Sequence, residues 1–326
     1  MGTRTALVTG GAGFIGSHVA DRLLAAGYDV TILDNLSSGR RENLPAAARF
    51  VEGCITSPEA AALVRDGQFS VMCHLAAQID VRRSVEDPAY DARINVLGSL
   101  NLLEAVRTAS AHTRVIFSST GGALYGDFAT PPSDELTAKD PEAPYGIAKL
   151  AVEYYMAYYG RVHKLDTVAL RYGNVYGPRQ DPHGEAGVVA IFCNRLIDGR
   201  ALTVFGDGTQ TRDYVYAGDV ADMNVRVAGA TLPPPARLDA RAFNVGTGVE
   251  TSVNTLAAAL QRAAGSAIPI DYAPARPGEL ARSALDITKS REVLGWSPAM
   301  SVEDGLAETY RWFAAYRASQ AGAGAA

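Results

Sequence analysis

Short apolar stretches recur through the first half of the chain and alternate with amphipathic segments. Apolar, β-branched stretches of this length are typical of strands that a parallel sheet buries on both faces. They predict strands at residues 5–9, 30–33, 71–75, 115–117 and 166–171, and a further strand that ends at residues 50–51. Between them, the three- and four-residue spacing of Val96, Leu100, Leu103 and Val106 predicts a helix from Asp91 to Ala109, and another is expected from Tyr145 to about Val162. The pattern predicts an α/β fold with a doubly wound (Rossmann) parallel sheet.

The alternation weakens after about Tyr176, where apolar stretches become shorter. Short strands are predicted at residues 202–205, 242–245 and 268–272, and the prolines at 233–235 mark an exposed connection. We predict a large Rossmann domain over residues 1–180 and a smaller C-terminal α/β substrate-binding domain over residues 181–326. Part of residues 213–245 is expected to return to the large domain.

A glycine-rich turn follows the first predicted strand directly. Gly10 permits a tight turn, Gly13 lets the backbone approach a pyrophosphate, and Gly16 lets the following helix pack closely on the strand. A phosphate would lie on free N–H groups at the positive end of that helix. Asp34 ends the second strand, where an acid can accept hydrogen bonds from an adenosine ribose and repel a 2′-phosphate. This favours NAD over NADP, although the neighbouring Arg40 and Arg41 leave NADP open.

Composition and charge narrow the range of partners. The 326 residues carry a net charge of −5, so nucleic acids and anionic membranes are not expected partners. Cys54, Cys73 and Cys193 are far apart and read as core residues, and the histidines have no metal-ligand spacing. The sequence shows no signal peptide and no long apolar segment, so we expect a cytoplasmic protein without a metal.

The strongest catalytic signal is the pair Tyr145 and Lys149, which lie four residues apart and share a helix face. Such a pair alone is common by chance. Here it follows a dinucleotide-binding half and a strand that ends in hydroxyl residues, Ser118 to Thr120. Small residues at Ala76 and Ala77 leave room for a flat ligand at the sheet edge. Asn95 is either a solvated helix residue or an amide that faces the cofactor.

With these motifs in place, the chain resembles the extended short-chain dehydrogenase/reductase family, and most closely its UDP-galactose (UDP-glucose) 4-epimerases. The resemblance covers nearly the whole chain. It rests on the Tyr145/Lys149 pair and on the segments Thr9–His18, Asp34–Gly39, His74–Gln78, Leu170–Arg179, Thr211–Tyr214 and Arg276–Glu279. Three positions depart from the family pattern: Cys54 stands where an adenine-contacting Asp is usual, Gly173 replaces a common Phe, and Thr120 occupies the usual serine position.

The resemblance implies tightly held NAD and a UDP-sugar across the interdomain cleft. With the glycine turn included, the predicted cofactor-binding residues are Gly10, Gly13, Phe14, Ile15, Gly16, Asp34, Asn35, Ser38, Gly39, Ile55, Leu75, Ala76, Ala77, Gln78, Asn95, Ser118, Tyr145, Lys149 and Tyr172. The predicted substrate-binding residues are Thr120, Asn174, Val188, Thr203, Phe205, Arg212, Arg276, Glu279 and Ser283. The arginines would hold the pyrophosphate, because a doubly charged group on a protein without a basic surface needs guanidinium partners.

For such an enzyme, the resemblance implies epimerisation at C4 through a transient ketone. Tyr145 as phenolate takes the O4 proton, the C4 hydride passes to the nicotinamide, and Thr120 hydrogen-bonds O4. An unperturbed phenol has a pKa of about 10, and we expect the Lys149 ammonium and the nicotinamide charge to lower that of Tyr145.

Other readings remain open. Related sugar 4,6-dehydratases and UDP-glucuronate decarboxylases carry carboxylates just after the strand-end threonine, whereas residues 121–125 here contain none. A UDP-glucuronate 4-epimerase and a non-catalytic NAD-binding sensor are further alternatives. Ser283 stands where related epimerases that exclude 2-acetamido sugars have a tyrosine, so UDP-GlcNAc and UDP-GalNAc are further possible substrates unless Arg282 or a loop shift fills the space. We expect a homodimer.

Overall fold

The computed structural model describes residues 4–182, 187–275 and 280–323. Its centre is a seven-stranded parallel sheet with the strand order β11-β6-β5-β4-β1-β2-β3. The strands are β1 (Arg4–Thr9), β2 (Tyr28–Asp34), β3 (Arg49–Glu52), β4 (Val71–His74), β5 (Arg114–Thr120), β6 (Asp166–Tyr172) and β11 (Ala242–Val245). Several are longer than the apolar stretches that predicted them, because polar residues continue the ladder at strand ends. The predicted doubly wound parallel sheet is confirmed.

The strand order reverses direction between β1 and β4, which are neighbours in the sheet. At such a reversal the two connections leave in opposite directions, so a crevice opens beyond the carboxyl ends of the strands. Thr9 and His74 end the two central strands and lie side by side in the register. Thr120 and Tyr172 end β5 and β6 and are paired in the same way. The fold therefore brings four motif segments to one edge of the sheet.

Helices cover both faces of the sheet. On one face lie α1 (Phe14–Ala25), α8 (Ala217–Gly229) and α10 (Thr288–Leu294), which pack on alternate strand residues such as Ala6 and Val8. On the other lie α2 (Pro58–Asp66), α5 (Gly98–Thr108) and α6 (Pro144–Val162), which pack on residues such as Leu7. Alternate residues of one buried strand thus serve both cores, as the period of a strand requires.

The predicted helix from Asp91 to Ala109 is interrupted. The chain instead forms α3 (Val81–Glu86), α4 (Pro88–Ala92), the π-helical turn η2 (Arg93–Leu97) and then α5. Apolar spacing cannot distinguish a π turn from an α turn, because the extra residue changes the register only locally. Wide turns of this kind occur mostly at functional sites. This one contains Asn95.

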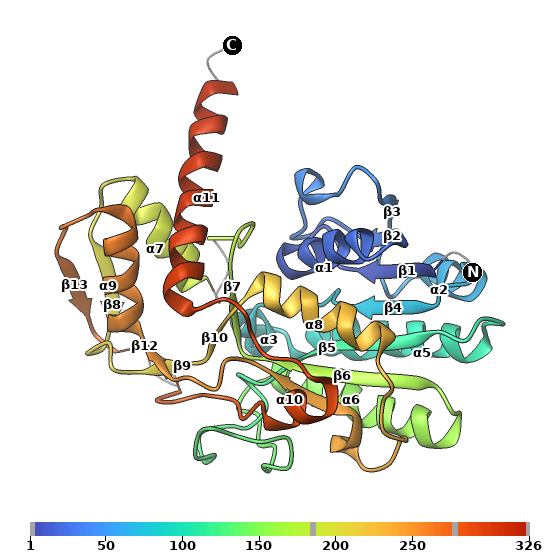
Figure 1. The fold of residues 1–326 in the computed structure, drawn as a ribbon. Coiled ribbons are helices and arrows are strands. Elements are labelled where there is room, and N and C mark those ends of the chain that lie inside the picture. Colours follow the sequence, from blue (N-terminus) through green and yellow to red (C-terminus); the bar gives the residue numbers. More distant parts are fainter. Residues whose placement is uncertain (1–3, 183–186, 276–279, 324–326) are drawn as a thin grey trace.

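A second group of elements lies beside the sheet, at the left of Figure 1. It contains α7 (Val188–Ile197), α9 (Val253–Ala264), the long α11 (Val302–Ala323) and the parallel pair β8 (Leu202–Phe205) and β13 (Ile270–Ala273). Its own apolar core includes Phe192, Leu256 and Phe313. The strand predicted at residues 268–272 begins and ends slightly later, as β13. Of the described helices, none is both long and apolar enough to cross a membrane.

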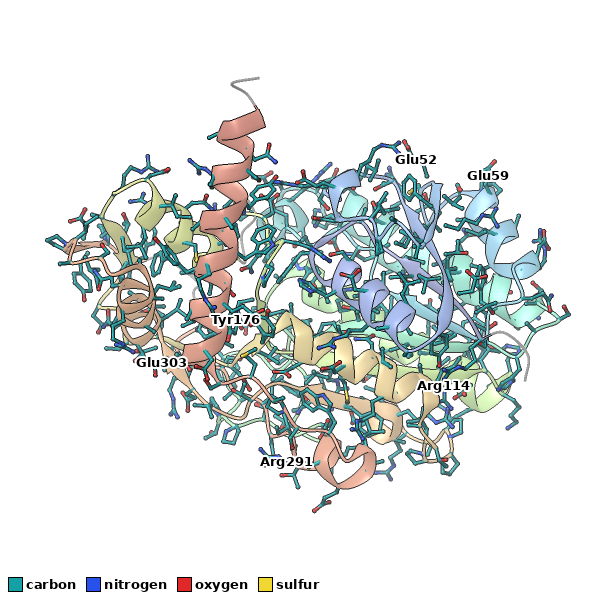
Figure 2. All side chains as sticks on the ribbon, turned by 45° about the horizontal axis from the view of Figure 1, so that its top comes forward. Glu52, Glu59, Arg114, Tyr176, Arg291 and Glu303 are labelled. Atoms are coloured by element: carbon teal, nitrogen blue, oxygen red, sulfur yellow. The ribbon has the colours of Figure 1, made fainter. Side chains whose placement is uncertain are left out.

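The chain passes between the two groups through short paired strands. These are β7 (Asn174–Tyr176) with β10 (Tyr214–Tyr216), in parallel, and β9 (Thr211–Arg212) with β12 (Thr251–Ser252), antiparallel. Two short 3₁₀ turns, η1 (Arg41–Asn43) and η3 (Leu238–Arg241), complete the described elements. Figure 2 shows Tyr176 at the foot of α11, where its hydroxyl donates to Val302 O over 3.3 Å. This hydrogen bond connects α11 of the second group to β7, which follows the sheet strand β6.

Candidate functional site

The glycine turn has the geometry of a phosphate cradle. Gly10 has φ +73°, and a Cβ there would lie 2.7 Å from the backbone nitrogen of Ala76. A Cβ on Gly16 would collide with the carbonyl oxygen of Gly10. The turn therefore needs glycine at both positions, and it leaves the N-terminus of α1 open to an anion. Phe14 and Ile15 form the first turn of that helix and are half-buried.

Asp34 joins the glycine turn to the loop that follows β2. Its Oδ2 accepts from Ala12 N at 3.0 Å and its Oδ1 accepts from Leu36 N at 2.8 Å. Gly39 passes so close that a Cβ would lie 2.9 Å from Asp34 Oδ1, while Asn35 and Ser38 are exposed. The carboxylate thus holds the loop in place and lies at the strand end where a ribose is expected.

Two residues of the loop after β2 also hold the turn: Arg40, which the sequence singled out only for its charge, and Asn43, which it did not single out. The carbonyl oxygen of Ala12 accepts from Arg40 N at 2.9 Å and from Asn43 Nδ2 at 3.0 Å. Ile55 is buried, and the Cys54 thiol lies 3.1 Å from Thr56 Oγ1. Cys54 is half-buried, so a contact from this position to an adenine would come from a small, weakly polar thiol.

His74 fixes the central strand ends through a buried chain of hydrogen bonds. Ala76 N donates to Thr9 Oγ1 at 3.2 Å, and this hydroxyl oxygen lies 2.8 Å from His74 Nδ1. Ser99 Oγ donates to Asn95 O at 2.6 Å and therefore accepts from His74 Nε2 at 2.9 Å. Nε2 thus carries a proton, and in the neutral ring Nδ1 accepts from the Thr9 hydroxyl. Burial and the charge of Lys149 lower the pKa of His74 to about 3, so the ring stays neutral.

Gln78 and Asn95 hold each other through their backbone and side chains. Asn95 Oδ1 accepts from Gln78 N and Asn95 Nδ2 donates to Gln78 O, both over 2.9 Å. The Asn95 amide is therefore occupied by the segment after β4, which contains Leu75, Ala76 and Ala77, all half-buried. These two hydrogen bonds explain why a polar residue stands at position 95: Asn95 supports the wall of the crevice. Its position in the sequence did not reveal this role.

Tyr145 and Lys149 stand on α6 beside the end of β5. Lys149 is 3% exposed, and its Nζ donates to Ser118 O at 2.8 Å and lies 5.7 Å from the centre of the Tyr145 ring. Ser84 Oγ accepts from Tyr145 N at 3.2 Å, which anchors the start of α6 to α3. Thr120 is half-buried at the end of β5. The structure thus places Ser118, Tyr145 and Lys149 together at the edge where Thr120 ends its strand.

The pKa values at this edge follow from burial. Desolvation lowers the pKa of Lys149 to about 8, against the opposing charges of Asp91 and Glu153. Desolvation and the charge of Asp91 raise the pKa of Tyr145 above its ordinary value. In the protein without a cofactor, burial thus sets the direction of the Tyr145 pKa, and the lowering expected from Lys149 together with the nicotinamide charge stays a prediction for the complex.

Tyr172 is nearly as deeply buried as Lys149. It is 4% exposed, and its hydroxyl accepts from Asn224 Nδ2 of α8 at 2.8 Å. It belongs to the apolar core between the sheet, α1 and α8. Tyr172 ends β6 beside Thr120 in the register, and the contacts of its side chain support that strand.

The predicted substrate side combines short strands and loops. Thr203 and Phe205 alternate along β8 with the buried Leu202 and Val204, so they share its outer face. Asn174 begins β7, its backbone nitrogen donates to Asp213 O at 2.7 Å, and a Cβ on Gly122 would lie 3.3 Å from Asn174 Oδ1. Val188 is the first residue of α7 and is half-buried.

Arg212 and Ser283 are brought close together. Ser283 N donates to Thr211 O at 3.2 Å, and Arg212 NH1 donates to the same carbonyl at 2.8 Å. The guanidinium of Arg282 donates to both carboxylate oxygens of Glu250, over 2.8 Å and 2.5 Å. Arg276 and Glu279 lie outside the described residues.

Asp213 is the main residue on this side that sequence reasoning placed in a motif without giving it a role. It is 1% exposed, and its carboxylate accepts from the backbone nitrogens of Thr247, Gly248 and Leu285 at 2.7, 3.0 and 3.2 Å. These bonds join two segments, the loop at residues 247–248 and the chain at Leu285, to the residue between β9 and β10. Asp213 thereby positions the neighbouring Arg212 and Ser283.

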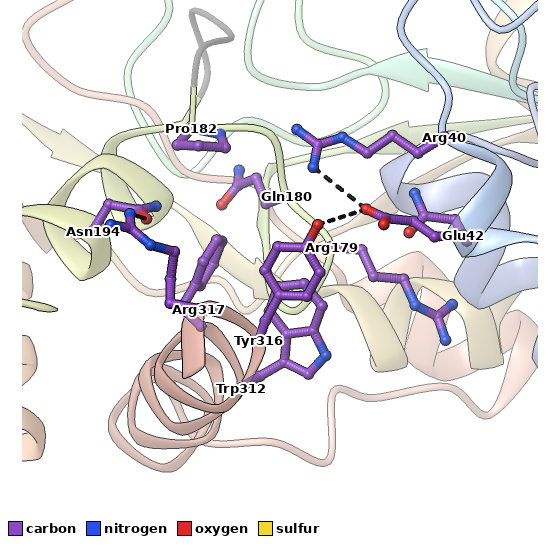
Figure 3. Close-up of a pocket in the computed structure, with 11 residues that line it drawn as sticks. Arg40, Glu42, Arg179, Gln180, Pro182, Asn194, Trp312, Tyr316 and Arg317 are labelled. Carbon is purple, nitrogen blue, oxygen red and sulfur yellow. Dashed lines mark hydrogen bonds and ion pairs between the residues drawn. The ribbon is translucent and has the colours of Figure 1, made fainter. Parts of the chain in front are cut away.

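A pocket of about 160 Å³ lies elsewhere, between α11 and the loop after β2. Figure 3 shows Tyr316, Trp312, Arg40 and Glu42 around it, and Tyr316 OH donates to Glu42 Oε1 at 2.7 Å. Its lining contains neither Tyr145 nor Lys149. Its volume is below the ~300 Å³ at which ligand sites usually begin, so it is a contact between the two groups of elements rather than the candidate site. Within the described ranges, no His, Cys, Asp and Glu side chains cluster as a metal site would require.

Comparisons with known proteins agree with this geometry. Residues 6–246 match the NAD dependent epimerase/dehydratase family. The chain is 47% identical over 312 residues to UDP-glucose 4-epimerase of Mycolicibacterium smegmatis, covering 94% of this chain and 97% of that protein. Among solved structures, it is similar to UDP-glucose 4-epimerase of Thermotoga maritima with UDP-glucose, with a TM-score of 0.90 and 45% identity over 96% of this chain and 99% of that one. It is also similar to the Thermus thermophilus UDP-glucose 4-epimerase in complex with NAD, with a TM-score of 0.87 and 42% identity over 95% and 98% of the two chains.

Proposed function

Because the chain belongs to the NAD dependent epimerase/dehydratase family, we propose that it is an NAD-dependent epimerase that interconverts UDP-glucose and UDP-galactose through a transient 4-keto sugar. The observation that carries this proposal is the placement of Tyr145 and Lys149 on α6, with Lys149 bonded to the strand end at Ser118. A phenol and a buried ammonium beside a dinucleotide cradle are the parts that alcohol oxidation at a sugar carbon requires.

The residues at the sheet edge fit the cofactor. Gly10, Gly13 and Gly16 form the pyrophosphate cradle, and the Asp34 carboxylate lies at the strand end where a ribose would be bound. Leu75, Ala76 and Ala77 line the wall that Asn95 supports. Bound NAD supplies reversible hydride chemistry at C4 of the sugar.

The protein's own part is to move one proton and to hold charge. Tyr145 Oη accepts the proton from O4 of the sugar, with Thr120 Oγ1 hydrogen-bonded to the same oxygen. Since burial raises the pKa of Tyr145, the phenolate depends on nearby positive charge, which the Lys149 ammonium supplies. After the ketone turns over, C4 would take back the hydride on its other face and Tyr145 would return the proton to O4, which completes the reaction with the opposite configuration.

The segment after β5 favours epimerisation over dehydration or decarboxylation. It consists of Gly121, Gly122, Ala123, Leu124 and Tyr125, without a carboxylate. A Cβ on Gly121 would lie 2.6 Å from the Leu285 side chain, so this turn is packed and carries small residues for that reason. A reaction that stops at C4 needs no additional acid or base there.

The proposed substrate side is formed by Asn174, Val188, Thr203, Phe205 and Arg212, with Arg276 and Glu279 from outside the described residues. Ser283 lies beside Arg212 and takes up less volume than a tyrosine would, and the Arg282 guanidinium is paired with Glu250. This arrangement supports a sugar site that also admits the acetamido pair UDP-GlcNAc and UDP-GalNAc.

A homodimer is part of the proposal. Ile147, Tyr154, Tyr158 and Val162 are 55%, 58%, 43% and 56% exposed and fall on one face of α6, and Leu97 of the adjacent η2 is 58% exposed. A stripe of exposed tyrosines and aliphatic residues is typical of a protein interface. Light scattering should give twice the chain mass for the wild type and a smaller species for Tyr154→Glu.

We also place the protein in the cytoplasm, since its cysteines are all free and Cys54 is only half-buried.

A panel of UDP-sugars tests the proposed function. The purified protein should convert UDP-galactose to UDP-glucose without added reductant, and the products can be resolved by chromatography. A protein that retains NAD but leaves both sugars unchanged would contradict the proposal.

A further inference from the structure

Asp91 is a buried carboxylate to which the proposed reaction assigns no role. It is 1% exposed and belongs to α4. Its Oδ1 accepts from Gln78 Nε2 at 3.0 Å and from Asn95 Nδ2 at 2.9 Å. Within the described part of the chain, its Oδ2 has no hydrogen-bond partner. A buried charged oxygen without a partner is costly, so another interaction must compensate it.

A positive charge that could compensate the Asp91 carboxylate lies on a helix packed against α4. α4 and η2 pack against α6, which carries Lys149. The Lys149 ammonium is itself buried, and its hydrogen bond goes to an uncharged carbonyl oxygen, that of Ser118. Burial raises the pKa of Asp91 and lowers that of Lys149, and in both cases the opposite charge of the other group acts against burial: Lys149 favours the Asp91 carboxylate, and Asp91 favours the Lys149 ammonium.

We propose that Asp91 is a positioning residue of the catalytic site, whose buried carboxylate is the counter-charge that holds Lys149 as an ammonium beside Ser118 and Tyr145. Its two hydrogen bonds tie this charge to Gln78 and Asn95, and thus to the crevice wall. The catalytic consequence rests on the proposed function, whereas the pairing of the two charges does not.

The other titratable groups around Lys149 either have hydrogen-bond or ion-pair partners of their own or carry no charge. Glu153, one turn further along α6, receives Arg171 Nε at 3.0 Å and Arg171 NH2 at 2.6 Å, and also the Ser119 hydroxyl at 2.5 Å. His74 of β4 is neutral in its hydrogen-bond chain. Tyr145 is a phenol whose pKa is raised. Glu153 also acts on Lys149, but its charge is paired with the Arg171 guanidinium, whereas the two hydrogen bonds to Asp91 come from uncharged amides.

Asp91 also affects Tyr145, in the opposite sense for activity. Its negative charge raises the pKa of the phenol, whereas by keeping Lys149 charged it supports the phenolate. Turnover alone would mix these two effects. A direct titration of Lys149 separates them.

The test is an NMR titration of protein labelled with ¹³C at the lysine ε-carbons. The chain's lysines are Lys139, Lys149, Lys164 and Lys289, so the spectrum is simple, and Lys149→Arg assigns the signal. In the wild type, Lys149 should titrate near pH 8. In Asp91→Asn the midpoint should fall by at least ~1 pH unit, the shift expected on removing a close opposite charge.

The matched control is Asp87→Asn, which changes the exposed N-cap of the same helix and keeps an oxygen for Tyr90 N. It should leave the Lys149 midpoint unchanged. An unchanged midpoint in Asp91→Asn would overturn the inference. The titration requires no turnover, so inactive wild-type protein would count against the proposed function and not against this pairing.

A second measurement covers the case in which Asp91→Asn does not fold. An unpaired buried ammonium should destabilise the single variant, and Lys149→Met in the same chain should relieve this. The double variant Asp91→Asn/Lys149→Met should then fold and show a cooperative thermal unfolding transition, although Asp91→Asn alone shows none. If the double variant also fails to fold while Lys149→Met alone folds, the two charges are not coupled and the proposal is wrong.

Discussion

The proposed cofactor side and the proposed substrate side of the crevice, called below the cofactor side and the substrate side, are built in different ways. On the cofactor side, Asp34, His74 and Lys149 are almost fully buried, and each is bonded to the backbone or to another buried group. On the substrate side, Thr203, Phe205, Arg212 and Ser283 are half-buried and lie on short strands or loops. The first side is part of the core that folds the sheet. The second lies on a frame that Asp213 holds in position.

From this difference we expect that substitutions will affect activity and stability together on one side of the crevice and separately on the other. A change on the cofactor side should disturb the folding core together with NAD binding, because the same bonds serve both. A change on the substrate side should alter affinity or selectivity and leave the melting temperature nearly unchanged. On the cofactor side, a catalytic hydroxyl is an exception to this rule. It can be removed without altering the packing of the core.

Tyr145→Phe tests that exception and should have the largest effect. Removing Oη should lower kcat by at least ~10³-fold, since the proton from O4 loses its acceptor. The variant should melt like the wild type and retain NAD, because the hydrogen bond of Tyr145 to Ser84 is made by its backbone nitrogen. Steady-state assays with UDP-galactose and a thermal melt check this. Near-wild-type turnover would show that another group is the base.

Arg212→Ala should weaken UDP-sugar binding by about 2–4 kcal/mol, the scale for removing one partner of a desolvated charge pair. NAD retention and the melting temperature should be unchanged. Calorimetry with UDP measures the effect. The matched control is Arg282→Ala, whose exposed guanidinium is paired with Glu250 and should matter little to UDP. Equal UDP affinity in the wild type and Arg212→Ala would remove Arg212 from the site.

Gly10→Ala should lower the free energy of unfolding by about 1–3 kcal/mol, the cost of a non-glycine residue held in an unfavourable conformation. Its Cβ would also press on Ala76 and narrow the phosphate cradle, so NAD should be lost at the same time. Gly229→Ala is the control, since a Cβ there meets open space. Denaturant unfolding and cofactor absorbance should report both losses for Gly10→Ala and neither for the control. Loss of NAD without loss of stability would break the proposed coupling.

Ser283→Tyr should have the smallest effect, which is one of selectivity. A tyrosine ring would fill the space of an N-acetyl group and cut activity on UDP-GlcNAc by at least ~10-fold, while largely sparing UDP-galactose. Ser283→Ala keeps the space and should behave like the wild type on both sugars. Competition assays with the two substrates measure the ratio. An equal loss on both sugars, or no acetamido activity in the wild type, would show that Ser283 does not control access.

The sequence predicted the parallel sheet and the glycine turn well because their signals are local. Strand period, a glycine turn that only glycine can form and residues at strand ends follow directly from adjacent positions in the chain. The parallel sheet and the segments at its edge are therefore as expected. The π turn at Arg93–Leu97 was missed because its apolar spacing resembles that of an α-helix.

The features that the sequence could not supply depend on packing between distant segments. In the protein without a cofactor, desolvation within the fold raises the pKa of Tyr145, which the sequence did not reveal. Asp91 carried one local signal, its place one helical turn before Asn95, which does not reveal burial or the nearby Lys149. Asp213 was recognised as part of a motif, yet its role requires two distant segments to meet it. In each case the missing information is which groups lose water when the chain folds.

The central claim is that the hydrogen at C4 leaves the sugar as a hydride and returns to the same carbon. Epimerisation of UDP-galactose in ²H₂O tests this most directly, with the C4 position of the UDP-glucose product read by proton NMR. The account predicts full retention of protium at C4, because only the hydroxyl proton on Tyr145 exchanges with solvent. Incorporation of deuterium at C4 would indicate deprotonation of carbon and would contradict the account.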